Sequence, residues 1–201
     1  EPLTLIVLMG LELLGGLSLG KRVFLLTGPP GIGKTTALKR TVDLVRGQGF
    51  TVGGMVTQEV RGAGGERVGF EILDLSTGIR GWLARACQGP GPRIGRYIVD
   101  IGALERIGAA SILGAVASSD VIAIDEIGPM ELLSEGFRAA VLRAVGCGKP
   151  VVATVHFRSS DPLVGSVKAR EDSSLFVLSA ENRGSIPGVI LGQVLSALRG
   201  F

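Results

Sequence analysis

"GPPGIGKTT" occupies positions 28–36 of this chain of 201 residues, just after the apolar run Val23–Leu26. The order of residues fits G-x-x-x-x-G-K-[ST], the pattern of the phosphate-binding loop known as the P-loop. In such a loop the glycines let backbone N–H groups turn toward an anion, and the lysine reaches the β- and γ-phosphates of a nucleotide. A turn without a ligand needs only one or two such residues, so nucleotide binding is the better interpretation. The predicted nucleotide-binding residues are Gly28, Pro29, Pro30, Gly31, Ile32, Gly33, Lys34, Thr35 and Thr36.

The sequence on both sides of this loop has the expected strand–loop–helix context. KRVFLLT (21–27) has the composition of a short buried strand, and KTTALKRTVDLVRGQG (34–49) has apolar residues at helical spacing. The helix would point its positive N-terminal end at the same phosphates. Lys34 is therefore a predicted catalytic residue that contacts the transferred phosphoryl group, and the hydroxyl of Thr35 is a predicted Mg²⁺ ligand.

Length and composition indicate one domain, residues 21–201, preceded by an apolar N-terminal extension at residues 1–20. The net charge is only +3 and no run of five or more basic residues occurs, so nucleic-acid binding has no strong signal. Cys87 and Cys147 have no metal or redox spacing and are typical of reduced thiols in a cytoplasmic protein. A single asparagine and four glutamines suit a protein from a thermophile.

The apolar N-terminal extension raises the question of a membrane. Pro2 to Leu19 form an apolar stretch of 18 residues, which is borderline for a membrane span of roughly 20. Glu12 interrupts the stretch, and no basic residue precedes it as in a signal peptide. An extra helix packed on the domain, or a mis-assigned start, is favoured over a membrane anchor, and membrane contact through residues 2–19 stays open.

The rest of the chain divides into two kinds of pattern. Three short strands at 51–60, 66–75 and 78–85, separated by RGAGG and STG, predict a β-hairpin insert at about 51–85, followed by a loop at 87–97. After residue 102 helices and strands alternate, which predicts parallel βαβ units. The expected class is a doubly wound, mostly parallel α/β sheet with an antiparallel hairpin insert. Helices are expected near 102–117, 131–145, 161–169 and 187–199, and strands near 119–128, 149–157 and 174–180.

A second motif, VIAIDEIG (121–128), supplies the acidic groups that a phosphate-binding loop lacks. An apolar strand that leads into Asp125 puts this carboxylate at the carboxyl edge of a parallel sheet, where open α/β sheets bind ligands. An aspartate there holds Mg²⁺, usually through water, opposite Thr35. The adjacent Glu126 is a predicted catalytic residue that orients and deprotonates a water molecule. The alternative is that either acid only favours the N-terminus of the next helix.

The adjacent Asp-Glu pair resembles the branch of P-loop proteins that have an additional strand and a catalytic glutamate. In that branch the strand after the aspartate strand inserts next to the P-loop strand, and here that strand is VVATVHF (151–157). Thr154 and His156 could then reach the γ-phosphate. His156 is the only histidine, and a lone histidine at a strand end is more often packed or at the surface.

Six segments in a fixed order resemble the thermophilic and cancer-related nucleoside-triphosphatase family. They are TGPPGIGKTT, GGMVTQEVRGAGGERVGFEI, GRYIVDIGALE, IDEIGPMEL, KPVVATVH and ENRG, and the resemblance runs from about Val23 to the C-terminus. It implies slow, Mg²⁺-dependent hydrolysis of several nucleoside triphosphates, with nucleotide contacts in the P-loop and the aspartate strand. The first 20 residues depart from the family, which opens almost directly with the P-loop strand. The implied contacts in the aspartate strand are Val121, Ile122, Ala123, Ile124, Asp125, Glu126, Ile127 and Gly128.

Arginines in the region 61–96 are candidates for stabilising charge in the transition state. Arg96 is the strongest of them and a predicted catalytic residue, because the family resemblance covers GRY (95–97), and Arg93 lies in the same loop. Arg61 and Arg67 flank the first hairpin turn. Most arginines in such loops are solvated.

Two further residues have weaker signals. Glu131 is expected only to favour the start of the next helix. Asn182, in the loop SAENRGSIP (179–187) after the last strand, is a candidate contact for the nucleotide base. No residue selects adenine over guanine.

The predicted function is Mg²⁺-dependent hydrolysis of ATP, GTP and other nucleoside triphosphates by a cytoplasmic monomer. One alternative is a nucleotide or small-molecule kinase, in which residues 51–97 would close as a lid. Another is a nucleotide-gated binding or assembly protein in which slow hydrolysis resets a switch.

Overall fold

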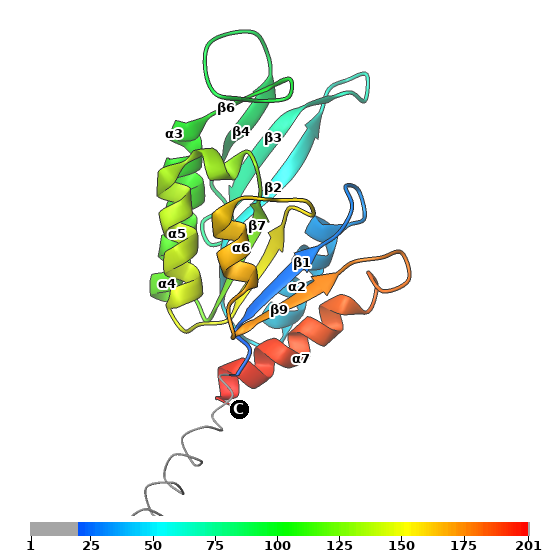
Figure 1. Ribbon diagram of the computed structural model, residues 1–201, viewed down its shortest axis with the longest axis vertical. Coiled ribbons are helices and arrows are strands. Elements are labelled where there is room, and N and C mark those ends of the chain that lie inside the picture. Colours follow the sequence, from blue (N-terminus) through cyan, green and yellow to red (C-terminus); the bar gives the residue numbers. More distant parts are fainter. Residues whose placement is uncertain (1–19, 201) are drawn as a thin grey trace, which may run out of the picture.

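The computed structural model describes residues 20–200, which form a nine-stranded sheet with helices on both faces (Figure 1). Across the sheet, the strands numbered along the chain follow the order β5-β6-β4-β3-β2-β7-β8-β1-β9. The apolar stretch at residues 2–19 lies outside the described residues, so the expectations about it stay predictions. The strands are β1 (Val23–Thr27), β2 (Val52–Arg61), β3 (Arg67–Asp74), β4 (Arg80–Ala86), β5 (Arg93–Ile94), β6 (Tyr97–Val99), β7 (Val121–Ile127), β8 (Val151–Val155) and β9 (Ser173–Val177).

Strands β2, β7, β8, β1 and β9 form the parallel half of the sheet. β8 lies between β1 and β7, because Val151 is opposite Val23 on one side and Ile122 on the other. This is the position predicted for the strand at 151–157. The carboxyl ends of parallel strands share one edge of a sheet, so the loops after β1, β7 and β8 open side by side.

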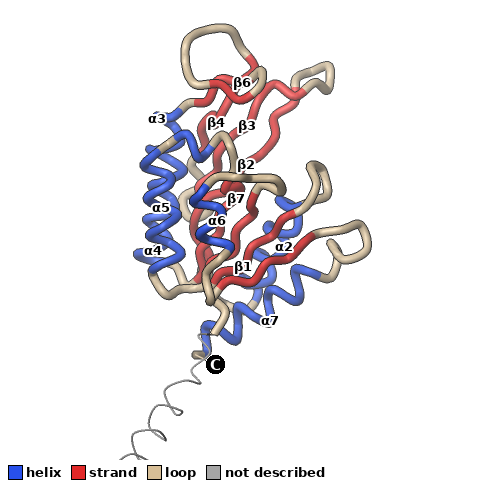
Figure 2. Tube along the Cα trace, viewed as in Figure 1, coloured by secondary structure: helices blue, strands red, loops and turns tan. Residues whose placement is uncertain are grey.

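The parallel half is buried on both faces, as in a doubly wound sheet. Val23 and Leu25 of β1 belong to one core cluster, and Phe24 and Leu26 belong to another. The first cluster is completed by α4, α5 and α6, and the second by α2 and α7 (Figure 2). The predicted α/β class is confirmed. The helices are α2 (Lys34–Gly47), α3 (Ile101–Ala103), the π-helix η1 (Leu104–Ala109), α4 (Ala110–Ser118), the 3₁₀-helix η2 (Glu131–Leu133), α5 (Glu135–Gly146), α6 (Pro162–Lys168) and α7 (Ile186–Arg199).

The continuous helical segment Ile101–Ser118 is the one helix within residues 20–200 that is long and apolar enough to cross a membrane. Its apolar side chains have a different explanation, because Leu104 and Ile112 are 0% exposed and belong to the core. We therefore interpret this segment as a core helix that packs on the sheet.

The antiparallel half differs from the prediction in where it begins. Val52–Met55 of β2 pair in parallel with β7, and from Met55 onward β2 pairs antiparallel with β3. The predicted insert at 51–85 therefore starts inside a strand of the parallel sheet. At Gly54 the backbones of β2 and β7 approach one another closely, because a Cβ atom on residue 54 would lie 2.1 Å from the carbonyl oxygen of Ala123.

Residues 87–97, expected to be a loop, contain β5 and the start of β6. β5 and β6 pair antiparallel, with Arg93 opposite Ile98 and Ile94 opposite Tyr97. The two strands therefore form the edge of the sheet. Residues 51–97 thus build strands β2 to β6 of the sheet, and the lid considered for these residues in the kinase alternative is not formed.

Candidate functional site

The P-loop joins the end of β1 to the start of α2, as predicted. Gly33 precedes the first residue of α2 with a φ of 105°, a left-handed conformation that favours glycine. The turn is closed by the N–H of Ile32, which donates to the carbonyl oxygen of Pro29 at 3.3 Å. No acidic residue occupies the first turn of α2. The N-terminus of α2 therefore keeps its positive partial charge for a phosphate group.

Lys34 connects this loop to the end of β7. Its Nζ atom lies 3.4 Å from the carbonyl oxygen of Gly28 and 3.6 Å from Oε2 of Glu126. The side chains of Lys34 and Glu126 are only 11% and 24% exposed, respectively. The structure thus brings two of the predicted catalytic residues together.

A bulge in β7 positions the two acids. Ile124 pairs with Ala153 and Ile127 pairs with Val155, so Asp125 and Glu126 together stand opposite the single residue Thr154. Bulges re-aim side chains at the edges of sheets. The four preceding residues of β7 are at most 1% exposed, so they contribute by placing Asp125 and not by contacting a ligand.

Asp125 is fully buried and hydrogen-bonded. Its Oδ1 accepts from the hydroxyl of Thr154 at 2.5 Å, and its Oδ2 accepts from the hydroxyl of Thr57 at 3.5 Å. Burial raises the pKa of Asp125, and hydrogen bonds from Thr154 and Thr35 oppose this rise. Thr35 and Asp125, the two predicted metal ligands, are therefore neighbours. Thr57 of β2 lies within one of the family-like segments but was not predicted as a site residue.

Glu126 lies between charged groups of both signs. Burial raises its pKa, the positive charges of Lys34 and His156 lower it, and the negative charge of Asp125 raises it. His156 follows β8, and its Nδ1 is buried without a hydrogen-bond partner within residues 20–200. His156 also lines a cavity of about 350 Å³ together with Pro129 and Arg158.

The structure does not bring Arg96 to the P-loop. Five strands lie between β6 and β1, so six spacings of about 4.8 Å place the two strands on the order of 29 Å apart. The guanidinium of Arg96 instead donates to the carbonyl oxygen of Arg67 at 2.5 Å and lies over the ring of Tyr97. The prediction failed because strand pairing, which is not visible locally in the sequence, places β5 and β6 at the far edge.

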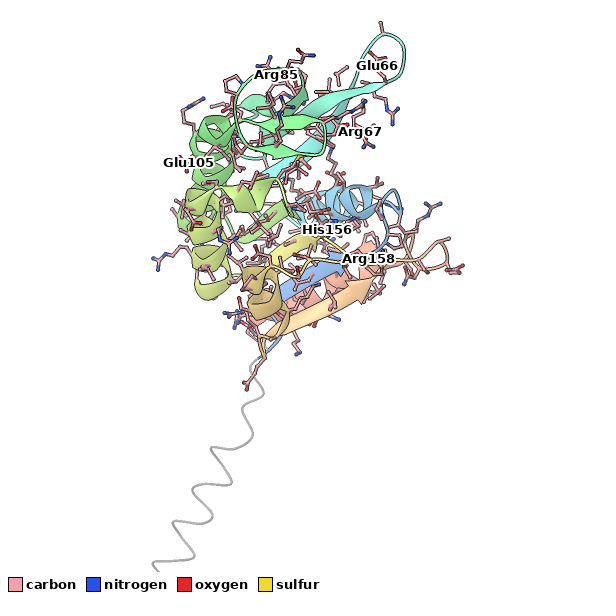
Figure 3. All side chains as sticks on the ribbon, turned by 45° about the horizontal axis from the view of Figure 1, so that its top comes forward. Glu66, Arg67, Arg85, Glu105, His156 and Arg158 are labelled. Carbon is pink, nitrogen blue, oxygen red and sulfur yellow. The ribbon has the colours of Figure 1, made fainter. Side chains whose placement is uncertain are left out.

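The other arginines of this region are also engaged away from the P-loop. Arg93 donates to the carbonyl oxygens of Cys87 and Gly89, and Arg61 and Arg67 both pair with Glu59. In Figure 3 Arg67 and Arg85 lie on the antiparallel half, whereas His156 and Arg158 lie on the parallel half.

A cavity of about 330 Å³ adjoins the P-loop on the side of the loop after β9. Its lining includes Gly33, Arg40 and Arg183, and Arg183 donates to the carbonyl oxygen of Ile32 at 3.5 Å. The amide of Asn182 is used within its own loop, where it accepts from the N–H of Ser179 and donates to the carbonyl of Val177. Arg40 and Arg183, which the sequence interpretation missed, are thus better placed than Asn182 to contact a base.

Glu131 is not at the start of an α-helix. Ser134 caps α5, since its hydroxyl accepts from the N–H of Phe137 at 3.0 Å. Glu131 opens the short η2 turn instead, and only 5% of it is exposed. Glu131 is therefore in the first turn of the next helical element, as expected, but that element is a 3₁₀-helix and the side chain is buried.

Comparison with known proteins gives a consistent result. The profile of a family described as NTPase matches residues 23–191. The chain is 48% identical over 174 residues to the nucleoside-triphosphatase THEP1 of Thermofilum pendens, across 86% of this chain and 95% of that protein. The crystal structure of THEP1 from Aquifex aeolicus matches with a TM-score of 0.76 and 31% identity, over 86% of this chain and 98% of that chain. The solution structure of a human cancer-related nucleoside triphosphatase matches with a TM-score of 0.74 and 37% identity, over 88% and 98%. The chain therefore belongs to the NTPase family.

Proposed function

We propose that the chain is a Mg²⁺-dependent nucleoside-triphosphatase that hydrolyses ATP, GTP and other nucleoside triphosphates to the diphosphate and phosphate. The observation that carries the proposal is the 3.6 Å separation between Lys34 Nζ and Glu126 Oε2. It sets an acid beside the lysine of the phosphate-binding loop. The name nucleoside-triphosphatase, carried by several similar proteins, supports the same reaction.

The triphosphate would lie along the P-loop, residues 28–36, with its γ-phosphate toward the end of β7. Backbone N–H groups of the loop and the positive end of α2 offer charge-assisted hydrogen bonds to the phosphate oxygens. Lys34 adds a full positive charge at the β- and γ-phosphates.

Thr35 and Asp125 fit the requirements of Mg²⁺. Asp125 is 0% exposed, and none of the ion pairs formed by residues 20–200 includes it. A buried carboxylate without a paired cation is costly, so this acid suits a cation site. Hydroxyl and carboxylate oxygens are the hard ligands that Mg²⁺ prefers, with phosphates and water completing its shell. When bound, the ion would neutralise negative charge on the phosphate oxygens.

Glu126 is the residue that we assign as general base. Burial raises its pKa above the ordinary value of a glutamate, and a higher pKa makes a carboxylate a stronger base. A water molecule held by Glu126 would stand close to the γ-phosphate bound by Lys34, as an in-line attack requires. With β8 between β1 and β7, this arrangement corresponds to the additional-strand, catalytic-glutamate type of P-loop protein.

The cavity beside the loop after β9 supports the proposal of broad base specificity. Arg40 and Arg183 line it, and guanidinium groups stack on the face of any base without reading its edge. Because the amide of Asn182 is engaged by its own loop, it is not free to select a base.

The test is phosphate release from the purified full chain with ATP, GTP, CTP or UTP alone, with and without Mg²⁺. The proposal predicts release from each triphosphate only with Mg²⁺, and no increase when hydroxyl acceptors are added. The Lys34→Ala variant is the control for a contaminating enzyme. Transfer of the phosphoryl group to an added acceptor, without release to water, would support a kinase and contradict the proposal.

A further inference from the structure

Glu131 is a buried acid at the edge of the candidate site that the reaction described above does not use. It is 5% exposed, and none of the ion pairs formed within residues 20–200 includes it. The neighbouring loop is held by the N–H of Leu132, which donates to the carbonyl of Gly128 at 3.0 Å. Burying a carboxyl group without a cation costs folding free energy, so Glu131 is expected to have a role that offsets this cost.

The carboxyl groups of Glu131 and Glu126 both lie beside Gly128. A Cβ atom on Gly128 would lie 2.9 Å from Oε1 of Glu126 and 3.1 Å from Oε2 of Glu131. Both acids therefore crowd the point where a larger residue 128 would have its side chain. A glycine at this position lets two carboxyl groups approach one another.

The surroundings keep Glu131 protonated at neutral pH. Burial raises its pKa to about 8, and the negative charges of Glu126 and Asp125 raise it as well. The backbone N–H groups of Glu131 and Gly128 lower it only in part. A neutral carboxyl group can accept from a backbone N–H with one oxygen and donate from the other, whereas an ionised one can only accept.

Charged groups near Glu131 come from several neighbouring elements. β7 contributes Asp125 and Glu126, and the positive charges of Lys34 and His156 act on Glu126 from the start of α2 and the end of β8. On the side of α5, Arg138 is engaged by Asp161. Glu105 accepts from the hydroxyl of Ser134. Glu126 is thus the acid whose carboxyl group the structure places beside that of Glu131, next to Gly128.

We propose that Glu131 is a positioning residue, whose buried carboxyl group holds the Glu126 carboxylate in place beside Lys34 for attack on the γ-phosphate. The inference rests on the proposed function, in which Glu126 is the general base. It deepens that function by adding a second carboxyl group that contacts neither substrate nor metal. The alternative is that Glu131 only caps the 128–131 loop.

The test compares Glu131→Gln, which keeps a neutral donor and acceptor, with Glu131→Leu, which keeps the approximate size and removes both. Glu135→Gln, an exposed site four residues later, is the matched control. We expect Glu131→Gln to keep kcat within about threefold and Glu131→Leu to lower kcat at least about tenfold, with KM and binding of a non-hydrolysable ATP analogue unchanged. We also expect kcat of the wild type to decline above about pH 8, as Glu131 ionises, and this decline to be absent in Glu131→Gln.

A double-mutant cycle separates positioning from loop capping. If Glu131 acts through Glu126, Glu131→Leu should lower activity little further in a Glu126→Gln background. Wild-type kcat in Glu131→Leu, or an unchanged alkaline decline in Glu131→Gln, would overturn the inference while leaving the proposed function intact. Full activity of Glu126→Gln would overturn the proposed function first. If Glu131→Leu does not fold, the pH profile of Glu131→Gln decides the question.

Discussion

The ammonium group of Lys34 stands 3.6 Å from the carboxylate of Glu126, and this pair links the helix after the P-loop to the end of β7. The two side chains are 11% and 24% exposed, so their attraction is less screened than that of a surface pair. The γ-phosphate of a bound nucleotide would replace Glu126 as the ion-pair partner of Lys34. That exchange would leave the Glu126 carboxylate to bind and deprotonate water, which joins substrate binding to activation of the base.

Lys34→Ala should weaken triphosphate binding and abolish turnover, while the fold stays intact. The lysine interacts with phosphate and Glu126 and does not fill the core. Titration with a fluorescent ATP analogue, phosphate release and circular dichroism measure the three properties. A variant with unchanged steady-state activity would contradict the assignment of residues 28–36 as the P-loop.

Thr154→Val should lower the free energy of unfolding by about 1–3 kcal/mol, the usual cost of removing a hydrogen bond from a buried group. The change keeps the shape of Thr154 and removes the 2.5 Å hydrogen bond to Asp125. Thr41→Val is the matched control, because the hydroxyl of Thr41 is equally buried and donates only to a helix carbonyl, that of Ala37. Equal urea midpoints for the two variants would show that the hydrogen bond to Asp125 contributes no more to the free energy of unfolding than the hydrogen bond of Thr41.

Stability should fall as pH rises from about 4.5 to about 8, owing to Glu131. The folded chain keeps this acid protonated up to a pKa of about 8, while the unfolded chain releases the proton near the ordinary value of 4.5. The stability that Glu131 contributes is therefore fully present below pH 4.5 and is lost progressively as the pH rises to about 8, on the order of 5 kcal/mol in total.

Glu131→Gln should remove most of that loss. Urea denaturation at pH 5, 6, 7, 8 and 9 compares the variant with the wild type, and Glu135→Gln serves as the exposed control. Asp125 and Glu126 also have raised pKa values, so a decline in stability from these two acids should remain in the variant. Identical slopes in wild type and Glu131→Gln would mean that Glu131 is ionised in the folded protein.

Deletion of residues 1–20 should leave an active enzyme. No motif precedes Lys21, whose ammonium group is already fixed by the carbonyl oxygens of Glu171 and Ser173. Vesicle flotation and phosphate release of the full and truncated chains provide the measurement. Membrane partitioning of the full chain alone would favour the anchor interpretation, and loss of activity on truncation would show that the extension serves the site.

The parts of the site that could be predicted are those that the sequence encodes locally. The P-loop and the Asp125–Glu126 pair depend on the order and spacing of neighbouring residues, and an apolar run is enough to place such an acid at a strand end. The alternation of strands and helices likewise predicted the parallel half, whereas the position of β8 was predicted from the resemblance of the Asp-Glu pair to P-loop proteins with an additional strand.

What could not be predicted depends on which strands pair. Arg96 looked close to the site because its loop carries a family motif, but five strands lie between β6 and β1. Thr57 reaches Asp125 only because β2 pairs with β7. Glu131 was expected to favour the start of the next helix. Its burial follows from a 3₁₀-helix that no residue pattern predicted. Tertiary contacts of this kind have no local signature.

Replacement of Glu126 by glutamine distinguishes general-base catalysis from the alternatives in a single variant. Glutamine keeps the size and hydrogen bonding of the side chain and removes the base, while Thr35, Asp125 and the P-loop stay as they are. Single-turnover hydrolysis of ATP should fall by a factor on the order of 10²–10⁴, and Mg²⁺–nucleotide binding, measured by calorimetry with a non-hydrolysable analogue, should be unchanged. Hydrolysis at the wild-type rate would contradict the account, because Glu126 would then not be the base.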